Sequence, residues 1–127
     1  MNGLFFINTS LFRTIIIAFI YLLSLWGCSE YSEEVQANLT KLKKTKACSG
    51  CDLTGVELIS FDLKGADLSG ANLTGANLKR SDLSEANLID TNLTDADLLG
   101  VNLTGATLIN TNLTGVKLSY ANISEVE

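Results

Sequence analysis

The chain of 127 residues contains no histidine and no proline, and only three cysteines. The absence of histidine removes the commonest general base and metal ligand, and the only side chain whose unperturbed pKa lies near neutrality. It argues against a catalytic triad and against most zinc sites, which use histidine or four thiolates. We therefore expect no catalytic residue, no metal site and no cofactor.

Basic residues are also scarce, and the charge is unevenly distributed. The net charge is −5. Four lysines fall within residues 37–50, whereas residues 51–127 carry eleven acidic residues against four basic ones, a net charge of −7. An acidic body does not bind nucleic acid directly, because phosphate contacts come chiefly from lysine and arginine. It can, however, imitate the charge of nucleic acid.

The N-terminal segment carries the one long hydrophobic stretch of the sequence. Arg13 is followed by an uncharged apolar run over residues 14–27, which is typical of a secretory signal and short for a bilayer span. The run ends in Leu25-Trp26-Gly27-Cys28, which resembles a bacterial lipobox except that Trp26 stands where a small residue is usual. That resemblance implies that Cys28 becomes the acylated first residue of the mature protein.

Two alternatives to lipidation remain open for this segment. Residues 3–27 are largely apolar and would suit an uncleaved membrane anchor, with Arg13 reaching the interface. Simple cleavage would leave Cys28 as an ordinary thiol. We interpret residues 1–27 as a signal peptide or membrane anchor, and expect the rest of the chain to be membrane-associated on the extracytoplasmic side, periplasmic or lumenal.

A large aliphatic residue recurs every five residues, without a gap, from Leu53 to Ile123. A period of five distributes side chains around an α-helix and alternates them between the faces of a flat strand. A chain that turns a corner once per repeat can instead direct every leucine inward, as a solenoid does. The other repeat positions favour the same arrangement. Small residues lie two positions before each leucine, Asp or Asn lies directly before it, and glycines such as Gly75 lie two positions after it.

The repeat, as in Ala71-Asn72-Leu73-Thr74-Gly75, resembles the motif of the pentapeptide-repeat family. The resemblance implies an all-β solenoid, a right-handed quadrilateral parallel β-helix with four pentapeptides per coil. Fifteen repeats would make about four coils, spanning residues 51–127. The recurrence of the segment 88–94 at 108–114 independently indicates a coil of 20 residues.

The two ends of such a solenoid need covers. Val35, Leu39 and Leu42 share one face of a helix over Ser32–Lys46, with acidic residues near its start and lysines near its end. Residues 28–50 are therefore interpreted as a linker and N-terminal capping helix that runs into a Cys-x-x-Cys sequence. No comparable cap follows the last repeat, so a homodimer through the C-terminal coil is a further expectation.

Three groups of residues are candidate sites. Cys51 falls at an inward repeat position. Its Cys-x-x-Cys spacing with Cys48 resembles an arrangement at the helix-to-solenoid junction of some family members, which implies a structural role as a disulfide or as buried thiols. A redox role is the alternative. A coil of 20 residues stacks Asp62 on Asp82, which indicates either a selected acidic stripe or the free interchange of Asp and Asn. Outward-facing apolar residues are candidates for an interaction surface: Ile89, Ile109 and Tyr120.

Three functions are compared. The first is a non-enzymatic interaction or structural module, tethered to a membrane and bound to an unknown protein partner. The second is DNA mimicry, since some pentapeptide-repeat proteins bind the topoisomerase gyrase in this way; these act in the cytoplasm. The third is a thiol redox role for Cys48 and Cys51. We expect the first, because it accounts for the signal, the repeats and the missing catalytic groups.

Overall fold

The computed structural model describes Ile15 and residues 31–127, and residues 31–127 form one compact unit. The expected signal or anchor segment, apart from Ile15, and the lipidation candidate Cys28 lie outside the described residues. Among the residues that are described, no helix is long and apolar enough to cross a bilayer.

Within residues 31–127 there is one helix, α2, which spans Glu33–Thr45 and lies within the stretch where the apolar spacing predicts a cap. The Ser32 side chain accepts a hydrogen bond from the Val35 N–H at 3.2 Å, which satisfies one of the free donors of the first turn. The helix ends at Lys46, whose backbone is left-handed and whose N–H donates to the Leu42 carbonyl. The buried face consists of Val35, Leu39 and Leu42.

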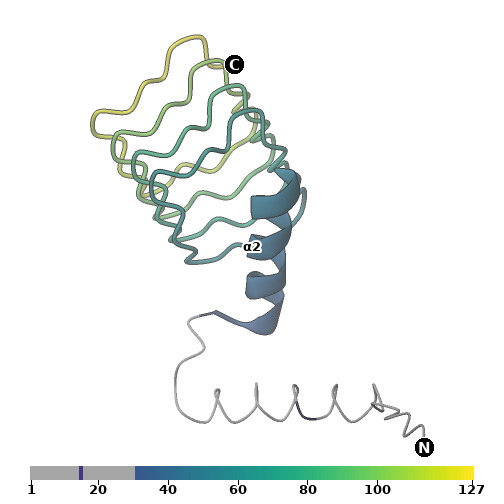
Figure 1. The fold of residues 1–127 in the computed structure, drawn as a ribbon. Helices are drawn as coiled ribbons and strands as arrows, with labels where there is room; N and C mark the ends of the chain where they lie inside the picture. Colours follow the sequence, from purple (N-terminus) through teal and green to yellow (C-terminus); the bar gives the residue numbers. More distant parts are fainter. Residues whose placement is uncertain (1–14, 16–30) are drawn as a thin grey trace, which may run out of the picture. The chain divides into compact units, whose positions relative to one another are not determined.

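Residues 47–126 wind into four stacked coils (Figure 1). Each parallel bridge joins residues 20 apart, from Ala47 with Asp67 to Asn102 with Asn122, which confirms the coil length predicted from the sequence. We number the coils by these bridges as first (47–66), second (67–86), third (87–106) and fourth (107–126). Within residues 31–127 each side of a coil contributes one bridged residue rather than a longer strand.

One pentapeptide makes one side of a coil and one corner. The Asn72 N–H donates to the Cys51 carbonyl at 2.9 Å, and the Asn72 carbonyl accepts from the Leu53 N–H at 2.8 Å. The Val56 N–H then closes a turn onto the Leu53 carbonyl, with Gly55 in the left-handed region at φ 68°. Glycine adopts a left-handed backbone with little conformational strain because it has no Cβ, which explains why glycine recurs at this point of the repeat.

The core is a column of leucines along the inside of the coils. The repeat leucines from Leu53 to Leu103 are at most 1% exposed, and small residues such as Ala66 and Ala76 pack between them. Three polar side chains also point inward: the Thr91 hydroxyl donates to the Leu68 carbonyl, the Thr111 hydroxyl to the Leu88 carbonyl and the Ser81 hydroxyl to the Leu78 carbonyl. From the sequence we expect small residues and Cys51 at this inward position; hydroxyls fit there because backbone carbonyls accept their hydrogen bonds.

The prediction that all fifteen aliphatic residues are buried is wrong in the fourth coil. Leu113 is 37% exposed, Leu118 38% and Ile123 57%, and Leu108 is half-buried. These side chains point inward like the others, but no described coil lies above them. Within the described residues, the fourth coil therefore leaves its apolar edge partly exposed.

Candidate functional site

The N-terminal edge of the first coil is closed by side chains from α2 and its flanks. The Asn38 side-chain amide donates to the Asp52 carbonyl at 3.0 Å. The Tyr31 hydroxyl accepts from the Glu57 N–H at 3.0 Å. Lys46 forms an ion pair with Asp62 at 2.9 Å. Together with the apolar face of α2, these contacts cover part of this edge.

Cys48 and Cys51 are joined by a disulfide, with their Cα atoms 5.3 Å apart. Both residues are buried, and the Cys48 sulfur lies 3.5 Å from the Asn38 carbonyl oxygen of α2. The pair therefore sits where the helix passes into the first coil. A redox role requires an accessible thiolate. A buried disulfide at this junction instead fits the structural interpretation.

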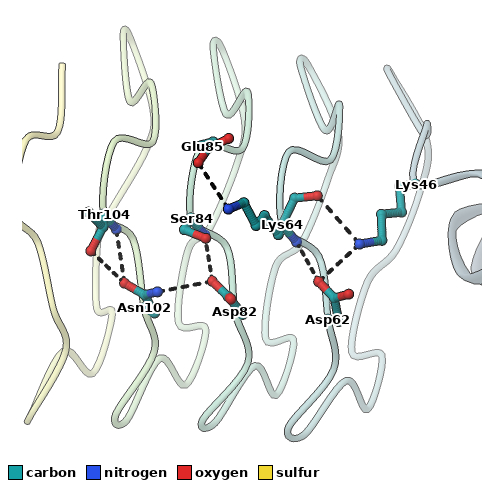
Figure 2. A network of polar contacts seen from close by, with 8 residues as sticks. All are labelled: Lys46, Asp62, Lys64, Asp82, Ser84, Glu85, Asn102 and Thr104. Atoms are coloured by element: carbon teal, nitrogen blue, oxygen red, sulfur yellow. Dashed lines mark hydrogen bonds and ion pairs between the residues drawn. The ribbon is translucent and has the colours of Figure 1, made fainter.

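Asp62 and Asp82 are stacked on one side of the solenoid, which we call the Asp62 side (residues 61–65, 81–85, 101–105 and 121–125) (Figure 2). The hydrogen bond from Lys46 and the Lys64 N–H hold the pKa of Asp62 below its usual value. Hydrogen bonds from Ser84 lower the pKa of Asp82. Each carboxylate is therefore compensated by its own donors.

Other polar and charged residues on the Asp62 side also form hydrogen bonds and ion pairs with one another (Figure 2). The Asn102 amide donates to Asp82 at 3.1 Å, and Lys64 forms an ion pair with Glu85 at 3.1 Å. The Thr104 hydroxyl donates to the Asn102 side-chain oxygen. The Asp62 side is thus a mixed hydrogen-bonded network rather than an uninterrupted acidic stripe.

The adjacent side, which we call the Glu57 side (residues 56–60, 76–80, 96–100 and 116–120), is also neutralised. Asp97 lies between Lys79, at 3.1 Å, and Lys117, at 3.8 Å. Burial opposes ionisation of Asp97, but Lys79 and the Leu99 N–H outweigh it and lower the pKa. Three of the four basic residues of the solenoid are therefore paired with carboxylates, which interrupts the continuous negative surface that a DNA mimic would present.

The apolar candidates do not form one patch. Ile89 and Ile109 share a column, as expected, with Ile89 half-buried and Ile109 49% exposed. Tyr120 is 92% exposed and has a left-handed backbone at φ 61°. It lies in the fourth coil, which also contains the partly exposed core residues Leu113, Leu118 and Ile123.

No group of His, Cys, Asp or Glu within the described residues is arranged to hold a metal ion. The sequence profile of the family "Pentapeptide repeats (8 copies)" matches residues 48–84, 62–99, 81–119 and 96–126, which are the residues of the four coils. The chain belongs to the pentapeptide-repeat family. Members of this family form right-handed quadrilateral β-helices and are generally structural or interaction modules rather than enzymes.

Among solved structures, this pentapeptide-repeat chain resembles HetL, a protein of the cyanobacterium Nostoc sp. Strain PCC 7120 involved in heterocyst differentiation regulation. The two are 35% identical with a TM-score of 0.63; the match covers 64% of this chain and 38% of HetL, so the chain spans well under half the length of that relative. No functionally curated protein matches the chain.

Two further solved structures are similar in sequence. A pentapeptide repeat protein from Nostoc Pcc 7120 is 38% identical over 72% of this chain and 84% of its own, with a TM-score of 0.44. A pentapeptide repeat protein from the cyanobacterium Cyanothece 51142 is 30% identical over 72% of this chain and 93% of its own, with a TM-score of 0.37.

Proposed function

We propose that this protein is a non-enzymatic interaction module whose solenoid is held at a membrane by the N-terminal segment and faces away from the cytoplasm. One observation carries the first part: the cysteines and several carboxylates of the solenoid are engaged in contacts within the chain. Cys48 and Cys51 form a buried disulfide, and Asp82 and Asp97 are bound by donors from neighbouring residues. What remains for other molecules is the exposed surface of the solenoid.

Support for the membrane tether comes from the sequence. The apolar run over residues 14–27 and the lipobox-like Leu25-Trp26-Gly27-Cys28 are typical of an exported lipoprotein. A disulfide between Cys48 and Cys51 also fits an oxidising compartment, because cytoplasmic thiols are kept reduced. The two features come from different parts of the chain and favour the same location.

The test is the intact mass and membrane fractionation of the chain expressed in a bacterial host with its own N-terminus. We expect membrane-bound protein whose mass begins at Cys28 with a lipid attached. The Cys28→Ala variant is the matched control and should retain the unprocessed mass. An uncleaved chain in the membrane fraction would keep the tether but replace the lipid by an anchor.

A soluble, unprocessed chain in the cytoplasm would overturn the tether. It would also make DNA mimicry the function to test, since gyrase lies in that compartment. The measurement is then protection of gyrase from inhibition by the purified chain.

A further inference from the structure

The four sides of the solenoid differ in charge. The Glu57 side carries a net charge of +1, from three basic and two acidic residues: Lys79, Arg80, Lys117, Glu57 and Asp97. Each of the other three sides carries a net charge of −2 or −3. Charges more than about 8 Å apart are largely screened at physiological ionic strength. A molecule close to the solenoid therefore responds mainly to the side that it touches, and the Glu57 side is the one that attracts anions.

Arg80 is the cation that this side leaves available. Both carboxylates of the side are already engaged, since Lys79 pairs with Asp97 at 3.1 Å and the Asn77 amide donates to Glu57 at 2.8 Å. Arg80 is exposed and forms no ion pair or side-chain hydrogen bond with any residue in 31–127. Its planar guanidinium presents paired donors that match the two oxygens of a carboxylate.

Apolar side chains surround Arg80. Ile59 is 52% exposed in the first coil, Leu99 is half-buried in the third and Tyr120 is 92% exposed in the fourth. The Arg80 N–H donates to the Leu99 carbonyl at 2.9 Å, which places these two residues side by side in adjacent coils. Gly100 stacks between Arg80 and Tyr120, and a Cβ there would lie 3.6 Å from the Arg80 Cγ. Glycine at this corner therefore leaves the cation uncovered.

The size of the Glu57 side limits what can bind there. Four coils stacked about 4.8 Å apart and an extended stretch of about three residues give it a flat area of about 200 Å². A stable interface between two folded proteins buries about 800 Å² on each partner. The side is therefore too small to hold a second folded copy by itself, and its size suits a short peptide segment.

We propose that the Arg80 surface (Ile59, Arg80, Leu99, Gly100 and Tyr120) binds a peptide segment of a partner protein that combines an acidic residue with large apolar ones. The carboxylate binds the Arg80 guanidinium, and the apolar side chains pack against Ile59 or Tyr120. An exposed ion pair is weak on its own, so the apolar contacts supply the affinity and the ion pair the specificity. The inference rests on the proposed role as an interaction module and names the kind of partner.

Nucleic acid and anionic membranes fit this surface less well. Both are bound through several lysines and arginines at once. The Arg80 surface offers one available cation on a solenoid whose other sides are acidic. A single carboxylate beside apolar groups matches that composition better.

The probe is a phage-displayed library of random peptides, selected on the purified full chain. We expect the enriched sequences to place an acidic residue next to an aromatic or large aliphatic one. The binding of the synthesised peptides, measured by fluorescence anisotropy, should weaken as the salt concentration rises. Enrichment of basic sequences, which the acidic sides would attract, or no enrichment at all, would overturn the proposal.

Two matched pairs of variants locate the binding site. Arg80→Glu should weaken binding at least tenfold, whereas Lys41→Glu, the same change of charge on the exposed face of α2, should leave it unchanged. Ile59→Ser should also weaken binding, whereas Ile109→Ser, 49% exposed on another side, should not. All four variants should keep the circular dichroism spectrum of the unmodified chain. Equal effects within either pair would contradict the proposal.

The same measurements separate this inference from the proposed function. Selected peptides that bind Arg80→Glu and Ile59→Ser as tightly as the unmodified chain would overturn the Arg80 surface, while the interaction module would remain with another face. A dimeric mass that becomes monomeric in Arg80→Glu would show that a second copy occupies the surface, and would also overturn the proposal. Because the measurements use purified chain, they do not depend on the membrane tether.

Discussion

Asn38 of α2 donates its side-chain amide to the backbone carbonyl of Asp52 in the first coil, at 3.0 Å. This contact joins the capping helix to a main-chain group that an added strand would otherwise occupy. An open sheet edge invites pairing with other chains. The helix thus covers part of one end of the solenoid by both an apolar face and a specific hydrogen bond.

The cap should contribute to stability mainly through its apolar face. Leu42→Ala removes a fully buried side chain and should lower the free energy of unfolding by about 2–5 kcal/mol. Asn38→Ala removes one hydrogen bond and should cost about 1 kcal/mol. Urea denaturation followed by circular dichroism measures both. Thr40→Ala, on the exposed face of α2, is the control; if all three variants were equally stable, α2 would not be a cap.

Leucine truncations should cost less in the partly exposed fourth coil than in the middle of the stack. Leu83 is fully buried between coils, so Leu83→Ala should lower the free energy of unfolding by about 2–5 kcal/mol. Leu118 is 38% exposed, and Leu118→Ala should cost less than half as much. Chemical denaturation of the two variants in parallel provides the comparison. Equal losses would mean that the fourth coil is covered in solution.

Tyr120 adopts a left-handed backbone without a side-chain contact to offset it. Its φ is 61° and its side chain is 92% exposed. Tyr120→Ala keeps a Cβ in this conformation, whereas Tyr120→Gly relieves it. We expect the glycine variant to be more stable than the alanine variant by about 1 kcal/mol, measured by thermal unfolding. The reverse order would show that the corner is not left-handed in solution.

Stability should fall only in strongly acidic solution. The pKa of Asp67 is lowered by hydrogen bonds from Ser69, and the pKa of Asp82 by those from Ser84. A depressed folded pKa adds stability that is present above the unfolded value, about 3.9, and is lost as the pH falls through the folded value. We expect a constant Tm from pH 7 to about 4 and a decline below it.

Asparagine at these two positions is the matched control for the acid decline. Asn has the same side-chain acceptor and occupies the equivalent place in other repeats, as Asn72 does toward Thr74. The double variant Asp67→Asn with Asp82→Asn should therefore fold normally and lose less Tm between pH 4 and pH 2. If the double variant lost as much Tm between pH 4 and pH 2 as the unmodified chain, the loss would come from other carboxylates.

The five-residue period made most of the solenoid predictable. Leucine at every fifth position has one common direction only if the chain turns at each repeat, and the recurrence of segment 88–94 indicated the 20-residue coil that the bridge between Asn92 and Asn112 confirms. The spacing of Val35, Leu39 and Leu42 located the helix face. Membrane attachment through Cys28 stays a prediction.

The contacts on the surface were less predictable, because they join residues far apart in the sequence. The stacking of Asp62 on Asp82 followed from the coil length, but the donors that compensate them did not. Lys46 reaches Asp62 only because α2 ends beside the first coil. The inward hydroxyl of Thr91 was missed because its acceptor, the Leu68 carbonyl, belongs to the coil below.

The sequence by itself determined the repeat, the inward leucines and the capping helix, since these depend on local spacing and on which side chains avoid water. Only the tertiary structure decided which backbone groups remain free. Hydrogen bonds between coils run from Leu53 to Asn72 and so on up the stack, and each coil is satisfied by the next. At Leu113, Leu118 and Ile123 that series stops within the described residues, and these side chains are partly exposed.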